Sequence, residues 1–160
     1  MGIAYSKRIR GEKAANLEKA IRCDHLALKV FTREADPAEW ARAQINLGVA
    51  YSERIRGEKA ANLEEAIRCY YLALEVLTRE ADPVYWAIAQ INQGVTYQNR
   101  IRGEKAANLE EAIRCYYLAL EVLTRENDPY NWEVIQHNLI QAHTDLLQEH
   151  RQSQSSRLGD

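Results

Sequence analysis

Apolar side chains recur every three or four residues along most of the chain, in stretches separated by short polar segments. In residues 37–55 the apolar positions include Trp40, Leu47 and Tyr51. A second stretch, residues 63–77, carries its apolar positions on one stripe. This spacing is typical of amphipathic helices, and because the polar connections are short, neighbouring helices are expected to pack antiparallel.

The pattern repeats at a fixed interval. Pro37, Pro83 and Pro129 are 46 residues apart. A fixed period of this length indicates stacked supersecondary units. The same interval separates equivalent tryptophans, glycines and cysteines: Trp40, Trp86 and Trp132; Gly11, Gly57 and Gly103; Gly2, Gly48 and Gly94; Cys23, Cys69 and Cys115.

Helix boundaries can be predicted from the residues at the ends of each stretch. Asp36 suits an N-cap and Pro37 a first helical turn, whereas Gly57 suits a left-handed helix end. Asn62 and Glu65 have the spacing of a capping box, which places the start of the second helix at Asn62. We therefore predict seven helices, near residues 2–9, 16–34, 37–55, 62–80, 83–101, 108–126 and 129–149.

These helices form a single predicted repeat domain over residues 1–149, followed by a flexible polar tail at 150–160. The domain consists of a partial first copy (1–36), two full copies (37–82 and 83–128) and a closing helix (129–149). In the first copy Asp24 and His25 replace Tyr70 and Tyr71, which gives the polar outer face expected of a terminal repeat.

Small and aromatic residues recur at defined places within the repeat: Leu47, Gly48, Tyr51, Ala66, Tyr70, Ala73 and Pro83. This set resembles the tetratricopeptide repeat family, although the period here is 46 rather than 34. The block RIRGEKAANLEEAIRC is also similar to long-repeat variants in bacterial signalling proteins that carry a CHAT-type peptidase or an NTPase elsewhere in the chain. The resemblance implies an all-α, right-handed superhelical solenoid of antiparallel hairpins that binds a protein or an extended peptide.

In such arrays the first helix of each hairpin lines the concave groove. Seven of the eight differences between the two full copies fall in the first helix, as expected of a surface fitted to a ligand or of drift at exposed sites. Asparagine, a poor residue in mid-helix, recurs there and could hold a peptide backbone or fix helix stacking. The candidate ligand-binding residues are Asn46, Asn92, Asn138, Arg42, Ile88, Val134, Ile45, Ile91, Val49, Val95, Gln98 and Asn99.

A second surface feature is a basic edge that could steer an acidic partner or could be a solvated face. Its nine cations precede or follow the glycines of the helix connections: Arg8, Arg10, Lys13, Arg54, Arg56, Lys59, Arg100, Arg102 and Lys105.

The remaining chemistry excludes most other functions. The formal net charge of −2 disfavours nucleic acid, and the lack of a long apolar run or signal-peptide pattern disfavours a membrane and predicts a cytoplasmic protein. No catalytic constellation, metal site or cofactor motif is suggested, so we expect a binding protein and not an enzyme. The cysteines are expected to be half-buried thiols, and Tyr70 and Tyr116 to be structural. Self-association, or a role as the repeat portion of a larger signalling protein, is the alternative.

Overall fold

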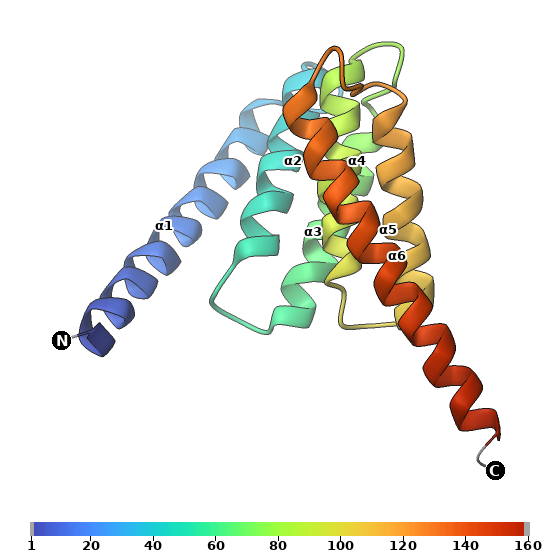
Figure 1. The fold of residues 1–160 in the computed structure, drawn as a ribbon. Helices are drawn as coiled ribbons and strands as arrows, with labels where there is room; N and C mark the ends of the chain where they lie inside the picture. Colours follow the sequence, from blue (N-terminus) through green and yellow to red (C-terminus); the bar gives the residue numbers. More distant parts are fainter. Residues whose placement is uncertain (1, 159–160) are drawn as a thin grey trace. The chain divides into compact units, whose positions relative to one another are not determined.

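The computed structural model describes the backbone of residues 2–158 and the side chains of residues 10–156. All regular structure in this range is α-helical and no strand is found there, which confirms the predicted all-α class (Figure 1). The helices are α1 (Gly2–Val30), α2 (Pro37–Glu53), α3 (Lys59–Leu74), α4 (Pro83–Gln98), α5 (Lys105–Leu120) and α6 (Pro129–Leu158).

Six helices are found in the described residues where seven were predicted, because α1 continues through Gly11. In the later copies Asn62 closes the loop by donating from Nδ2 to the carbonyl oxygen of Arg56 at 2.8 Å, whereas the equivalent Asn16 is exposed on a continuous helix. The loop that this hydrogen bond closes after Gly57 is not formed around Gly11, where α1 runs on as one helix.

The helix starts at Pro37, Pro83 and Pro129 agree with the sequence. The side chain of Asp82 accepts a hydrogen bond from the backbone N–H of Tyr85 at 3.4 Å, as an N-cap does. Gly57 and Gly103 have φ values of +81° and +82°, the left-handed conformation that glycine adopts most easily. The chain therefore turns between helices at Gly57 and Gly103, as predicted, although not at Gly11.

The second helix of each hairpin begins three residues earlier than predicted, at Lys59 and Lys105. Glu58 is the N-cap of α3, and Asn62 lies within the first turns of the helix. The predicted capping box of Asn62 and Glu65 is therefore wrong, because the Asn62 side chain reaches back to the loop and Glu65 pairs with Arg68.

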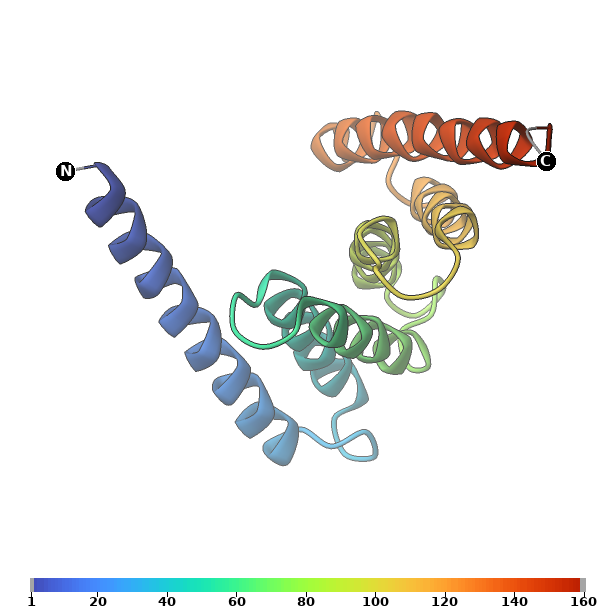
Figure 2. The same cartoon turned by 90° about the horizontal axis from the view of Figure 1, so that it is seen from below.

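The chain divides into two compact units, Met1–Val76 and Leu77–Asp160. In unit 1, α2 packs against both α1 and α3 (Figure 2). The core of this unit includes Ile21, Leu47 and Cys69, one from each helix. In unit 2, α5 packs against both α4 and α6, and α4 also contacts α6. We call α2, α4 and α6, which start at proline, the leading helices, and α1, α3 and α5 the trailing helices.

Each hairpin is built around one tyrosine and one glycine. Tyr70 and Tyr116 are almost fully buried. A Cβ atom placed on Gly48 would lie 2.6 Å from Cε1 of Tyr70, and one on Gly94 would lie 2.7 Å from Cε1 of Tyr116. Real Cβ atoms do not approach so closely, so glycine is required on the leading helix to make room for the tyrosine ring on the trailing helix.

The last helix is longer than predicted. Helix α6 has 30 residues and ends at Leu158, so the segment predicted as a tail is helical through residue 158. Helix α1 has 29 residues, whereas the four inner helices have 16 or 17. The two end helices are therefore nearly twice as long as the helices between them.

Candidate peptide-binding surface

The three asparagines proposed to hold a peptide lie at one register of the three leading helices. Asn46 is exposed, and Asn92 and Asn138 are half-buried. Among the described residues, the structure shows no hydrogen bond from any of these three side-chain amides. They are neither buried nor paired between helices, which leaves each amide able to offer a donor and an acceptor to another molecule.

The residues one turn before the asparagines change from charged to apolar. Arg42, Ile88 and Val134 are all half-buried. The Nη1 atom of Arg42 lies 2.6 Å from Oε1 of Glu39 in the same helix, so its charge is partly compensated within the protein. Val49 is half-buried and Val95 is 37 % exposed, so both leave some apolar surface open beside the asparagines.

Four other candidates are engaged within the protein, and two of them are not available at all. Ile45 and Ile91 are 4 % and 8 % exposed, so they belong to the core and not to a ligand surface. Gln98 accepts a hydrogen bond from the hydroxyl group of Tyr116 at 2.9 Å. Asn99 donates to the carbonyl oxygen of Val95 at 2.8 Å and so satisfies the end of α4. An apolar residue on a leading helix cannot be assigned to core or groove by register alone.

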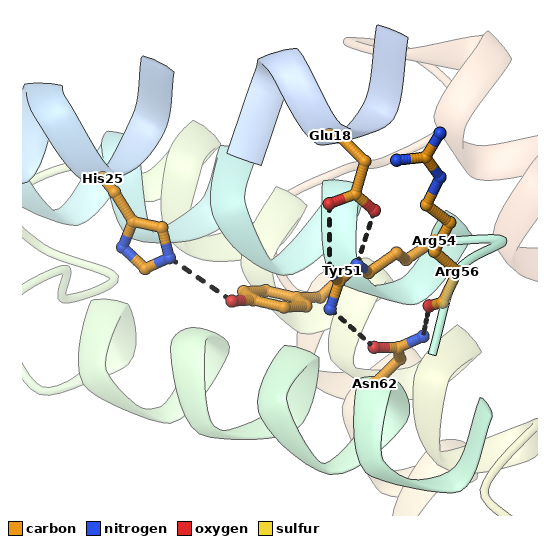
Figure 3. A network of polar contacts seen from close by, with 6 residues as sticks. All are labelled: Glu18, His25, Tyr51, Arg54, Arg56 and Asn62. Carbon is orange, nitrogen blue, oxygen red and sulfur yellow. Dashed lines mark hydrogen bonds and ion pairs between the residues drawn. The ribbon is translucent and has the colours of Figure 1, made fainter. Parts of the chain in front are cut away.

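Part of the predicted basic edge is structural. The guanidinium group of Arg54 binds both carboxylate oxygens of Glu18, at 2.8 and 2.9 Å, and its Nη1 donates to Oδ1 of Asn62 at 3.4 Å (Figure 3). The hydrogen bond from Arg54 holds the pKa of the Glu18 carboxyl group below its usual value. Because Glu18 lies on α1 and Arg54 follows α2, the pair ties two helices of unit 1 together.

In unit 2 the equivalent loop is closed by the same kind of hydrogen bonds. Asn108 donates to the carbonyl oxygen of Arg102 at 2.9 Å and accepts from Nη1 of Arg100 at 3.3 Å. Lys105 donates to the carbonyl oxygen of Gln98 at 2.7 Å, at the end of α4. Sequence reasoning treated these cations as a surface feature and missed the asparagine that organises them. The identity of residues 54–80 and 100–126 was the available signal, since it includes both the cations and the asparagine.

The cysteines differ more than predicted. Cys69 and Cys115 are fully buried, and burial raises the pKa of each thiol to about 12. Cys23, at the equivalent position of α1, is exposed. All three are free thiols, and within residues 10–156 no cluster of three histidine, cysteine or acidic side chains is placed to hold a metal ion.

Comparison with known proteins adds no assignment. Within residues 2–158, no helix combines the length and the apolar character needed to span a membrane. The chain matched none of the protein-family models, curated proteins or solved structures with which it was compared.

Proposed function

We propose that this chain is a scaffold that binds a protein or an extended peptide along its leading helices. In this proposal the two units stack as a right-handed superhelix, and α2, α4 and α6 line its concave face, as the resemblance to tetratricopeptide repeats implies. The proposed role is binding and includes no catalytic step.

The observation that carries the proposal is the state of Asn46, Asn92 and Asn138. Asparagine inside a helix lowers helix stability, because its side chain competes for backbone hydrogen bonds. Here three asparagines occur at one register, and their amides make no hydrogen bond to the described part of the protein that would repay this cost. An extended peptide has N–H and C=O groups that such amides can bind.

The neighbouring residues give the proposed peptide a direction. Arg42 would favour an acidic group near α2, and Ile88 and Val134 would favour apolar side chains near α4 and α6. The position is therefore selective for the order of side chains in the peptide as well as for its backbone.

A display library of random peptides tests this function. Peptides selected on the wild-type protein should bind the triple variant Asn46→Ala, Asn92→Ala, Asn138→Ala at least about tenfold more weakly, since each lost hydrogen bond is worth about 0.5–1.5 kcal/mol. Asn16→Ala, at an exposed position of α1, is the matched control and should bind normally.

The melting temperature separates binding from folding in this experiment. The triple variant should melt close to the wild type, because alanine is the better helix former. Unchanged peptide binding, or a sharply lower melting temperature, would contradict the proposal and assign the asparagines to the packing of the helices.

A further inference from the structure

Unit 2 shows how a leading helix sits on a pair formed by a trailing helix and the next leading helix. Helix α5 packs against α6, and Oη of Tyr117 lies 3.4 Å from Nε2 of His143 across this pair. Helix α4 contacts both, and its Gly94 lies against the ring of Tyr116. Leu109, Ala112 and Tyr116 are 0 % exposed beneath this arrangement.

Unit 1 contains the same pair of helices in α1 and α2. Nε2 of His25 lies 3.3 Å from Oη of Tyr51, at the two positions equivalent to Tyr117 and His143, with the residue types exchanged (Figure 3). The two helices of the pair therefore meet at the same register in both units, although the side chains there differ.

On the pair in unit 1, the place equivalent to that of α4 is an open groove. The groove has a volume of about 360 Å³. Ala20 is exposed there, whereas the equivalent Ala66 and Ala112 are 0 % exposed. Its wall from α1 corresponds residue by residue to the buried positions 109, 112 and 116 of α5. The lining residues are Leu17, Ala20, Asp24, Asn46, Val49, Ala50 and Glu53.

Helix α6 carries the face that such a groove requires. Ile140 occupies the position of Gly48 and Gly94, the glycines that face the following trailing helix, and it is 68 % exposed. Leu147, two turns later on the same face, is 59 % exposed. Within the described part of unit 2 (77–156), α5 and α4 pack against the other sides of α6.

The groove on α1 and α2 and the exposed face of α6 match in helix register and in the sizes of the facing side chains. When Ile140 is set opposite Asp24, as Gly48 is opposite Tyr70, residues 134–158 of α6 run antiparallel to residues 6–30 of α1. The overlap includes most of both long end helices. The large side chain is then on the leading helix and the small one on the trailing helix, the reverse of the glycine–tyrosine contact.

We propose that α6 of one copy lies in the groove between α1 and α2 of a second copy, so that the chain assembles head to tail. Each junction would reproduce the hairpin packing of α2 with α3. Because the two surfaces differ, the contact is heterologous, and it forms an open chain or a closed ring of copies. This inference does not rest on the peptide binding proposed above, but the groove includes Asn46 and Val49, so a neighbouring copy would cover part of the proposed peptide surface.

Sedimentation velocity over a range of concentrations tests the assembly. The wild-type mass should rise with concentration through successive oligomers. Ile140→Asp should raise the concentration needed for assembly at least about tenfold, because it removes an apolar side chain and places a second carboxylate opposite Asp24. The matched control is Ile101→Asp, which changes the same residue type at 61 % exposure outside the proposed contact and should assemble like the wild type.

Mixing two variants distinguishes a head-to-tail contact from a symmetric one. Ala20→Arg blocks the groove and Ile140→Asp blocks α6, so each variant alone should remain monomeric. Together they retain one intact groove and one intact α6, and should form a dimer that grows no further. A wild type that stays monomeric at all concentrations, or a mixture that forms no dimer, would overturn the proposal.

Cys23 gives a second readout, which can be measured on the wild-type protein. It lies on the exposed side of α1 next to the groove, whereas Cys69 and Cys115 are buried and should react slowly. Assembly should slow the reaction of Cys23 with a maleimide as protein concentration rises, and Ile140→Asp should abolish this slowing. A labelling rate that is independent of concentration in the wild type would contradict the contact.

Discussion

The two units use the same parts in opposite order. Unit 1 has a leading helix, α2, between two trailing helices, whereas unit 2 has a trailing helix, α5, between two leading helices. The sequence of α3 is identical to that of α5, and both place their tyrosine against a glycine at nearly the same distance. The tyrosine–glycine contact is therefore the same in both hairpins, although some substitutions between the units lie inside the hairpin, as at Gln93 and Gln98, which accept hydrogen bonds from Cys115 and Tyr116.

The contacts of the end helices differ more than the hairpins. In unit 1, Glu18 and Arg54 join α1 to the end of α2 with a bidentate ion pair. In unit 2 the position of Arg54 is taken by Leu146, which lies within the long helix α6, and the position of Glu18 by the exposed Glu110. The repeated sequence thus gives similar hairpins, whereas single substitutions change the contacts of the end helices.

The largest expected effect tests whether the two hairpins are equivalent. Tyr70→Ala and Tyr116→Ala should each lower the free energy of unfolding by about 3–5 kcal/mol, because each removes a fully buried aromatic ring and leaves a cavity. Denaturant unfolding, with hydrogen exchange to resolve the units, measures both. Tyr117→Ala, at an exposed neighbouring position, is the control and should cost much less. A small effect at only one tyrosine would show that the hairpins are not equivalent.

A comparison of the predicted helices with those of the structure shows what a repeated sequence can predict. The class, the proline helix starts and the glycine turns followed from local chemistry, and the structure agrees with them. The predicted helix break at Gly11 was wrong, because the loop that Asn62 closes by a hydrogen bond in the next copy is not formed around Gly11. The extension of α6 to Leu158 was missed because its polar residues carry no apolar stripe.

The candidate surface was predictable only in part. The spacing of the asparagines placed them on one register, but periodicity could not show that Ile45 and Ile91 are in the core. Likewise, counting cations could not show that Arg54 binds Glu18, because the two residues are 36 positions apart in the sequence. Such contacts depend on how separate helices pack, which a pattern along one helix does not contain.

The next largest effect is expected at a buried position of the leading helices where the two units have different residues. Leu47 is buried in unit 1, and Gln93 takes its place in unit 2 with its Nε2 atom buried and without a hydrogen-bond partner. Gln93→Leu should stabilise unit 2 by about 1–3 kcal/mol by removing the unpaired Nε2, since the bond given up at Oε1 is the weak one from the Cys115 thiol at 3.6 Å. Leu47→Gln should destabilise unit 1 by a similar amount. Hydrogen exchange of each unit checks both signs. If Gln93→Leu is destabilising, the Gln93 amide has a role that outweighs its missing partner.

The equivalent glycines should respond with opposite signs. Gly11→Ala should stabilise α1 by about 0.5–1 kcal/mol, because alanine is the better residue inside a helix and a Cβ atom there meets nothing within 4 Å. Gly57→Ala should destabilise its hairpin by about 1–2 kcal/mol, because it forces a left-handed conformation on alanine. Circular dichroism and thermal melting measure both. A loss of stability in Gly11→Ala would mean that the first copy turns at Gly11 as the later copies do.

The smallest expected effect concerns the Arg54–Glu18 ion pair of unit 1, whose equivalent positions in unit 2 are Leu146 and Glu110. The hydrogen bond from Arg54 lowers the folded-state pKa of Glu18 below its value in the unfolded chain, so ionised Glu18 stabilises the fold. This contribution is fully present above about pH 4.5, the unfolded value, and is lost as the pH falls through the lowered folded value. Glu18→Gln should therefore be less stable than the wild type at pH 7, and the difference should disappear in acid.

Glu110→Gln is the matched control for this prediction, since Glu110 occupies the same register of α5 opposite Leu146 in place of an arginine. Its stability should follow the wild type at every pH. The two variants are compared by urea unfolding from pH 7 down to pH 3, monitored by hydrogen exchange in α1 and α6. A Glu18→Gln difference that persists unchanged in acid would show that the side chain acts through packing, since protonation of Glu18 removes the charge but leaves the shape of the side chain nearly the same.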